Sequence, residues 1–297
     1  MTSLLSERAV LAQEALAECR LCLRNCGVDR RGSRQGAFCR LDEKAWIYKE
    51  LLSLGEEAAL NPTWLVDVGG CSLRCLYCSE WPQVVAPQRG GAVPLDPEWF
   101  ARRMAHRRAQ GARTVTLVGG EPTVNLPALL TALAACDTPL PVVWNSNGLV
   151  TSQARALLQG VVAVWSLDAK FGNPLCAQRI SGNAADIDHR DWQETALLAL
   201  SQPPQAGLPA LVVRHLLMPG HLECCTRPVL VRLARIAATA PPGLVFVNLM
   251  SWFAAPVQPG LRRVPELSAQ LQPAEVAHAQ ALARDLLGPR LWLDGRP

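Results

Sequence analysis

Short apolar runs alternate with longer amphipathic segments from Thr63 to Met250, and this alternation limits the fold more than any other feature. Strands that alternate with helices imply a parallel sheet with right-handed crossovers. The expected strands are Thr63–Val68, Thr114–Val118, Pro141–Asn145, Val161–Leu167, Leu211–Leu217 and Leu244–Leu249. The expected helices are Pro97–Ala109, Leu126–Ala135, Thr151–Leu158, Asp191–Leu200 and Arg227–Ala238. Six such units are fewer than the eight that close a full barrel, so the sequence predicts an α/β fold with a partial (β/α)6 barrel.

The same pattern divides the chain into three parts. Residues 1–61 are expected to form a helical, Cys-rich metal-binding extension, with a helix over Met1–Arg20 and a loop over Cys19–Cys39. Residues 62–251 contain the partial barrel. Residues 252–297 form a proline-rich tail with one more helix, Pro273–Leu287.

Composition and charge exclude several classes of function. A net charge of +4 on 297 residues is too small to indicate binding to nucleic acid or to a membrane surface. No apolar run approaches the roughly 20 residues that would span a bilayer. The 11 cysteines fall mainly in two dense groups of a long chain, which favours metal binding in a reducing compartment over a disulfide framework. We therefore expect a cytoplasmic protein.

Cys71, Cys75 and Cys78 lie within one short stretch that directly follows the first expected strand. Four thiolates would complete the coordination of an iron–sulfur cubane, so three thiolates leave one iron open to a ligand from outside the protein. Two alternatives remain at this point. The cysteines could belong to a zinc site whose fourth ligand lies elsewhere, or to a core that contains unrelated thiols.

Further polar motifs follow the later strands, where ligands gather in parallel α/β folds. The candidate binding residues are Gly119, Gly120, Glu121, Pro122, Asn147, Asp168, Lys170 and Arg214. Arg214 can hold a carboxylate with a bidentate fork, whereas its neighbour His215 is more typical of a core histidine. The alternatives are a plain strand-to-helix turn for the glycines, a conformational role for Asn147 and a solvated ion pair for Asp168 with Lys170.

The cysteine spacing and the Gly-Gly-Glu-Pro stretch resemble those of radical S-adenosylmethionine (SAM) enzymes. The resemblance implies a [4Fe-4S] cluster on Cys71, Cys75 and Cys78, with the amino acid end of SAM on the open iron. It implies that Tyr77 lies near the adenine of SAM, although Tyr77 could instead pack the loop. It implies that Gly119–Pro122 binds the SAM amino group. Arg214 and the Asp168–Lys170 pair become candidate SAM contacts, together with Asn147.

This resemblance also implies a reaction. SAM would be cleaved reductively to methionine and a 5′-deoxyadenosyl radical, which abstracts hydrogen from a substrate in the barrel. The electron would come from a flavodoxin- or ferredoxin-type donor. The rival hypotheses are a non-catalytic or electron-transfer iron–sulfur protein with the same fold, and a zinc-stabilised binding module built on Cys19–Cys39.

A narrower resemblance is to the PflX-type branch, relatives of the pyruvate formate-lyase activating enzyme. It is carried by Cys22–Arg30, the Asp168–Lys170 pair and the run Arg214–Gly220. The substrate would then be a glycyl radical enzyme, with a small molecule as the alternative. The chain departs from that branch at Ser79–Trp81 and at Met250–Pro256, where a substrate would approach.

A second group of cysteines precedes the barrel. Cys19, Cys22, Cys26 and Cys39 have spacings that suit structural zinc or a second iron–sulfur cluster. The remaining cysteines are expected to be small buried hydrophobic residues, and they are Cys136, Cys176, Cys224 and Cys225.

Overall fold

The computed structural model describes residues 2–183, 186–205, 207–254 and 259–297. It contains two compact units. The first consists of Met1–Glu56, Leu60–Ser72 and Glu80–Trp165, and the second of Glu57–Ala59, Leu73–Ser79 and Ser166–Pro297. The division of the sequence at residues 61 and 251 stays a prediction.

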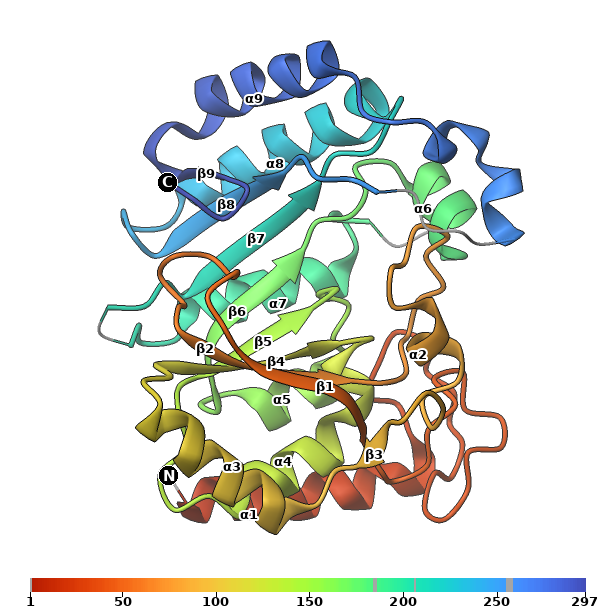
Figure 1. Ribbon diagram of the computed structural model, residues 1–297, viewed down its shortest axis with the longest axis vertical. Coiled ribbons are helices and arrows are strands. Elements are labelled where there is room, and N and C mark those ends of the chain that lie inside the picture. Colours follow the sequence, from red (N-terminus) through yellow and green to blue (C-terminus); the bar gives the residue numbers. More distant parts are fainter. Residues whose placement is uncertain (1, 184–185, 206, 255–258) are drawn as a thin grey trace. The chain divides into compact units, whose positions relative to one another are not determined.

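The first unit is built on a sheet with a parallel centre. Its strands are β1 (Trp46–Ser53), β2 (Thr63–Val68), β3 (Val93–Pro94), β4 (Thr114–Gly119) and β5 (Val142–Ser146), in the order β3-β1-β2-β4-β5 (Figure 1). β2 pairs in parallel with β4, and β4 with β5, whereas β1 runs antiparallel to β2 and β3. Every residue of β2 is buried, which is typical of a parallel strand.

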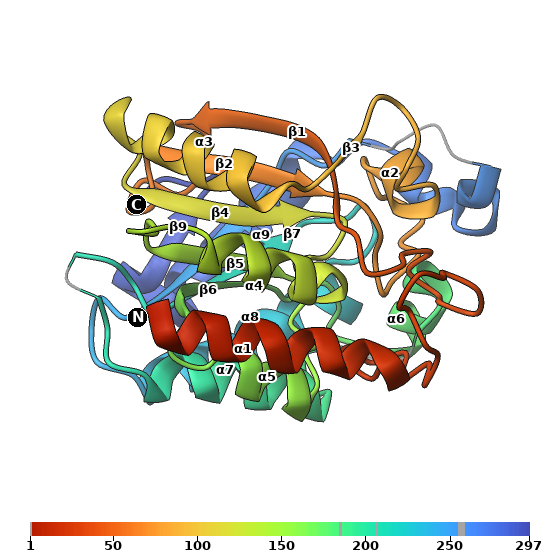
Figure 2. The same ribbon diagram turned by 90° about the horizontal axis from the view of Figure 1, so that it is seen from below.

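The first unit also contains helices. They are α1 (Thr2–Glu14), η1 (Ala15–Glu18), α2 (Trp81–Val85), α3 (Pro97–Ala109), η2 (Pro122–Asn125), α4 (Leu126–Ala134) and α5 (Ser152–Leu158). α1 runs along α4, as Figure 2 shows. Asp96 caps the start of α3, because its carboxylate accepts the backbone N–H of Trp99 at 2.6 Å. Phe100 of α3 packs on Trp64 of β2 with ring centroids 4.8 Å apart.

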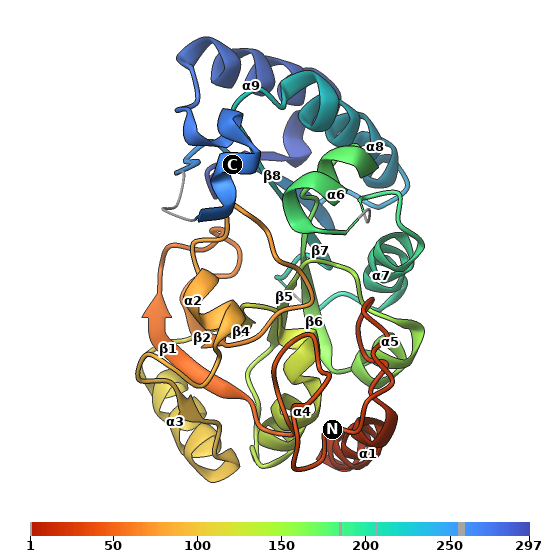
Figure 3. The same ribbon diagram turned by 90° about the vertical axis from the view of Figure 1, so that its right-hand side faces the viewer.

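The second unit continues the alternation of strands and helices. Its strands are the end of β6 (Val162–Asp168), β7 (Leu211–Leu216), β8 (Val245–Met250) and β9 (Leu291–Leu293). Its helices are α6 (Pro174–Ser181), α7 (Arg190–Ser201), η3 (Leu222–Thr226), α8 (Arg227–Ala238), η4 (Pro259–Arg263), η5 (Pro265–Ser268), α9 (Pro273–Leu287) and η6 (Gly288–Arg290). β8 pairs in parallel with both β7 and β9, and α8 lies beside α9 (Figure 3).

The structure confirms a mixed α/β fold with a largely parallel sheet, preceded by a helix and a cysteine-bearing segment. The predicted strands correspond to β2 and β4–β8, and the predicted helices to α3, α4, α5, α7, α8 and α9, with bounds that agree to within one residue. The first helix is shorter than expected, because α1 ends at Glu14 and passes into η1. Closure into a partial barrel stays a prediction.

Among the described residues, five strands and α-helices were missed from the sequence: β1, β3, β9, α2 and α6. β1 carries Lys49 and Glu50 in its middle and is only partly buried, so it lacks the apolar run that marks the other strands. α6 has only 8 residues, too few to show a clear helical period. None of the helices described is long and apolar enough to cross a membrane.

Asp67 is a buried carboxylate in the middle of the first unit's sheet. Its Oδ2 lies 3.4 Å from Nζ of Lys49 on β1, and its Oδ1 accepts the hydroxyl of Tyr48 at 3.4 Å. Burial raises the pKa of Asp67 to about 6, although the Lys49 cation lowers it. The folded state therefore favours the protonated form, and the stability that this form contributes is lost as the pH rises through about 6.

We expect the Asp67→Asn variant to be more stable than wild type at pH 8 by about 2 kcal/mol, because the amide is neutral at every pH. At pH 5 the wild-type carboxyl is largely protonated, so the advantage should shrink. Thermal unfolding of both proteins at the two pH values measures this difference. An equal difference at pH 5 and pH 8 would contradict the account.

Candidate active site

Cys71, Cys75 and Cys78 follow β2 in a stretch without helix or strand. All three carry thiols that are not joined in disulfides; Cys71 and Cys75 are buried and Cys78 is half-buried. Cys71 and Ser72 belong to the first unit, and the rest of the stretch belongs to the second.

The second part of this cysteine loop is held by α6. The backbone N–H of Arg74 donates to the carbonyl of Ser181 at 3.2 Å, and that of Leu76 donates to the carbonyl of Ile180 at 2.9 Å. Both acceptors lie in the last turn of α6, where helical carbonyls lack intrahelical partners. The last turn of the helix thus fixes the backbone that carries Cys75.

Lys170 and Asp168 form an ion pair close to Cys75. Lys170 Nζ lies 2.6 Å from Oδ2 of Asp168, and the two side chains are 25% and 23% exposed. Burial lowers the pKa of Lys170, but Asp168, Tyr77 and Cys75 together raise it well above its ordinary value. Burial raises the pKa of Cys75 to about 12, while Lys170 lowers it. Lys170 is therefore a cation that favours the thiolate form of Cys75.

Tyr77 packs against aromatic rings of the same unit. Its ring centroid lies 6.4 Å from that of Phe171 and 6.3 Å from that of Phe253. Burial raises the pKa of its hydroxyl well above the usual value, so the phenol stays protonated. A packing role is thus established by contacts, and a position near the adenine of SAM stays a prediction.

Gly119 and Gly120 allow the ends of β4 and β2 to approach closely. Gly119 has φ +115°, and a Cβ there would collide with the backbone of Val68. A Cβ on Gly120 would collide with the carbonyl of Gly70. Both glycines are required by backbone packing. Their binding to the SAM amino group, with Pro122 at the start of η2, stays a prediction.

Glu121 is a buried carboxylate that accepts hydrogen bonds from its own unit. Oε1 accepts the N–H of Thr123 at 3.0 Å and the hydroxyl of Ser146 at 2.8 Å, and Oε2 accepts the N–H of Asn147 at 2.9 Å. Burial outweighs these bonds and raises the pKa of Glu121. A carboxylate accepts about four hydrogen bonds, so most of its capacity is already used.

Asn147 connects this carboxylate with the start of the cysteine loop. Its Nδ2 donates to the hydroxyl of Ser72 at 3.0 Å, and its Oδ1 accepts the N–H of Leu149 at 3.0 Å. The first unit thus brings Glu121 and Asn147 together beside Ser72, the residue that follows Cys71. The side chain of Asn147 thus stabilises the turn after β5, which agrees with a conformational role for this residue.

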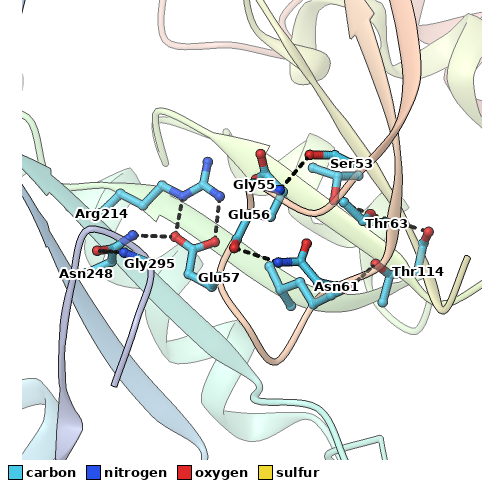
Figure 4. A network of polar contacts seen from close by, with 12 residues as sticks. Ser53, Gly55, Glu56, Glu57, Asn61, Thr63, Thr114, Arg214, Asn248 and Gly295 are labelled. Carbon is cyan, nitrogen blue, oxygen red and sulfur yellow. Dashed lines mark hydrogen bonds and ion pairs between the residues drawn. The ribbon is translucent and has the colours of Figure 1, made fainter. Parts of the chain in front are cut away.

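Arg214 on β7 is paired with a residue that the sequence did not mark. Its Nε lies 2.7 Å from Oε1 of Glu57 and its Nη2 lies 2.6 Å from Oε2, which is a bidentate fork (Figure 4). Asn248 donates to Oε1 of Glu57 at 2.8 Å. Burial raises the pKa of Glu57, but Arg214 and Asn248 bring it below the usual value. The bidentate fork of Arg214 is therefore occupied by Glu57, and binding of SAM by Arg214 stays a prediction.

His215 is a core histidine, as expected. One ring nitrogen lies 2.6 Å from the carbonyl of Ala169 and the other 3.0 Å from the hydroxyl of Thr226. Burial lowers its pKa to about 4, so the ring is neutral near pH 7.

The N-terminal cysteines are electrostatic neighbours. The pKa of Cys22 is raised to about 12, mainly by burial and in addition by its neighbours Cys39, Cys19 and Cys26. Arg30 lies beside the group and donates to Sγ of Cys19 at 3.4 Å. The same guanidinium donates to the carbonyls of Leu41, Asp42 and Val124. The four cysteines are thus electrostatic neighbours, and binding of zinc or of a second cluster by them stays a prediction.

Comparison with known families decides the class of protein. The family model of the radical SAM superfamily matches residues 65–230, more than half of the chain. The chain belongs to the radical SAM superfamily. The uncharacterized protein MJ0674 of Methanocaldococcus jannaschii is 32% identical over 287 residues, which cover 95% of this chain and 78% of that protein.

Solved structures give a more distant likeness. Streptococcus suis SuiB bound to its precursor peptide SuiA matches 75% of this chain with a TM-score of 0.49 and 10% identity. SuiB bound to S-adenosylmethionine matches 75% of it with a TM-score of 0.48 and 12% identity. The chain spans only 46% and 47% of those two SuiB chains.

Membership of the radical SAM superfamily implies a [4Fe-4S] cluster and SAM, and the donor set fits the cluster. Cys71, Cys75 and Cys78 offer three thiols within one loop, which leaves one iron open. Leu73 is buried within the loop and Lys170 supplies a positive charge beside Cys75. Apolar surroundings and nearby charge are the features by which proteins tune such clusters.

The pair formed by Glu57 and Arg214 should stabilise the second unit. We expect Glu57→Gln to lower the free energy of unfolding by about 3 kcal/mol, because it removes one partner of a buried ion pair. The double variant Glu57→Gln/Arg214→Met should lose less than the sum of the single variants. Urea unfolding of the four proteins measures this coupling.

The coupling should also depend on pH. The pKa of Glu57 is lowered in the folded state, so the coupling is complete at neutral pH and is lost as the pH falls through that pKa. Strictly additive losses at pH 7 would contradict the assignment.

Proposed function

We propose that this radical SAM protein is an enzyme that cleaves SAM reductively and directs the resulting 5′-deoxyadenosyl radical to abstract hydrogen from a substrate. The observation that carries the proposal is the set of three cysteine thiols, Cys71, Cys75 and Cys78, in a chain of this superfamily. When bound, the cluster would supply the electron for this cleavage. A flavodoxin- or ferredoxin-type protein is the proposed source of that electron.

The residues of the chain would hold the cluster and support the loops around it. The three cysteines would hold the cluster, and the hydrogen bonds from Arg74 and Leu76 to α6 hold their loop. Lys170 offsets negative charge beside Cys75, and its partner Asp168 keeps the lysine in place. Glu121 and Asn147 hold the ends of β4 and β5 in one conformation, which supports the proposed SAM contacts there.

A narrower proposal concerns the substrate. The PflX-type motifs favour activation of a glycyl radical enzyme, and a small molecule is the alternative substrate. Ser79–Trp81 differs from that branch directly after Cys78, and residues 255 and 256 of the second departure lie outside the described residues. Incubation with deuterium-labelled candidate substrates, followed by a search for label in 5′-deoxyadenosine, tests each class separately.

Alanine at Cys71, Cys75 or Cys78 should abolish formation of 5′-deoxyadenosine from SAM in the presence of dithionite, because each change removes a cluster ligand. The matched control is Cys136→Ala, which removes a buried thiol after the end of α4 whose Sγ donates to the carbonyl of Ala132 at 3.4 Å. It should retain activity. Cleavage that persists in all three variants would reject the site, whereas full iron and sulfide in wild type without cleavage would favour the electron-transfer alternative.

Lys170 should tune the cluster. We expect Lys170→Met to shift the reduction potential to more negative values by roughly tens of millivolts, because a nearby cation stabilises the added electron. Lys170→Arg keeps the charge and should shift the potential less. A redox titration followed by electron paramagnetic resonance measures both. Equal potentials for the Met and Arg variants would show that the charge of Lys170 does not act on the cluster.

A further inference from the structure

Four potential metal ligands of the second unit lie close together, and all four are far along the chain from Cys71, Cys75 and Cys78. Cys176, His221, Cys224 and Cys225 each offer one ligand atom, and these atoms all lie within 4.8 Å of one another. Sγ of Cys176 is 3.8 Å from Sγ of Cys224. Nδ1 of His221 is 3.3 Å from Sγ of Cys224 and 3.7 Å from Sγ of Cys225. The expectation that these cysteines are merely buried hydrophobic residues therefore fits Cys136 better than the other three.

The histidine ring is oriented for coordination. Its Nε2 lies 3.5 Å from Oε1 of Glu266, and Arg179 forms an ion pair with the same carboxylate. An ionised carboxylate is a hydrogen-bond acceptor, so it favours the tautomer in which Nε2 carries the proton and the lone pair of Nδ1 faces the thiols. A carboxylate behind a histidine is the usual support of a metal ligand, because it fixes the ring and raises its basicity.

The surroundings suit a site closed to solvent. His221 and Cys225 are buried, and Cys176 and Cys224 are half-buried. The thiols border an apolar cluster that includes Phe171, Ile180 and Leu267. Both Cys224 and Cys225 lie in η3, a π-helical turn in which the N–H groups of Cys225 and Thr226 share the carbonyl of His221. Such turns often occur at functional sites.

We propose that Cys176, His221, Cys224 and Cys225 form a closed, structural zinc site. Three soft thiolates and one imidazole make up one of the common four-ligand sets of zinc. Zinc–sulfur bonds of about 2.3 Å and zinc–nitrogen bonds of about 2.0 Å in a tetrahedron place two sulfurs ~3.8 Å apart and sulfur and nitrogen ~3.5 Å apart. The distances of 3.8, 3.3 and 3.7 Å between these atoms agree with that arrangement.

Two other arrangements fit less well. A disulfide between Cys176 and Cys224 would leave the lone pair of His221 and the thiol of Cys225 without a common role. An iron–sulfur cubane binds each thiolate to a different iron, which separates the ligand sulfurs more widely than a single ion does.

Zinc at this site would fasten α6 to η3 and to the start of α8. α6 carries Cys176 in its first turn, and the carbonyls of Ile180 and Ser181 in its last turn hold the cysteine loop. The site would therefore support the backbone around Cys75. The binding of zinc itself does not depend on the proposed cleavage of SAM.

Zinc and iron per chain, measured by mass spectrometry on anaerobically purified and cluster-reconstituted protein, test the proposal. Cys176→Ser should contain about one zinc ion less per chain than the matched control Cys136→Ser, with iron unchanged. Glu266→Gln should keep the ligands but weaken zinc binding about 10- to 100-fold in competition with a chelator. Equal zinc in Cys176→Ser and Cys136→Ser would overturn the site.

A second measurement uses the wild-type protein, so it does not depend on the folding of a variant. N-ethylmaleimide labelling, read out on peptides by mass spectrometry, should modify Cys176 and Cys224 much more slowly in zinc-loaded than in chelator-treated protein. Equal rates, or a disulfide between the two cysteines in the anaerobic protein, would overturn the proposal.

Discussion

The parallel register between β2 and β4 is the constraint on which the first unit's candidate site depends. Thr63 pairs with Thr114 and Val68 with Gly119, so both strands end at the same level. The cysteine loop and the Gly119–Glu121 turn therefore start side by side. Only glycine is tolerated at 119 and 120, because the backbones of the two strand ends touch. A residue with a side chain there would separate the strands and shift everything that follows them.

Buried polar groups hold the segments that follow these strands. Glu121 accepts two backbone N–H groups and a hydroxyl, and Asn125 donates to the carbonyls of Gly69 and Glu121. Leaving such groups unpaired in a dry interior costs about 1–3 kcal/mol each, so they favour one arrangement of the loops. The same logic applies to the N-terminal segment. Arg24 donates to the carbonyl of Ser72 at 2.6 Å and stacks over Phe38, which ties this segment to the residue next to Cys71.

In the second unit, charged pairs and aromatic packing hold together segments that are far apart in the chain. Lys170 and Asp168 act on the pKa values of Tyr77 and Cys75, although the two pairs come from separate stretches of the chain. Glu57 and Arg214 are 157 positions apart and share two hydrogen bonds. Such pairs form only when the fold brings distant residues together. The radical SAM signature on its own would not have led to Glu57, because no motif surrounds it.

Strands β2 and β4–β8 and helices α3, α4, α5, α7 and α8 between them could be predicted from the amino-acid sequence, because hydrophobic periodicity is a local property. The three loop cysteines are also a local pattern, and their resemblance to those of a known family indicated the superfamily. The sequence also marked Glu121, Asn147, Lys170 and Arg214, but not what their side chains contact. Tertiary structure alone decided that Arg214 is paired with Glu57, that the Gly119–Gly120 pair serves strand packing and that Cys176 lies beside His221 and Cys224. Those outcomes depend on contacts between residues far apart in the chain, whose partners and distances are set by packing and burial.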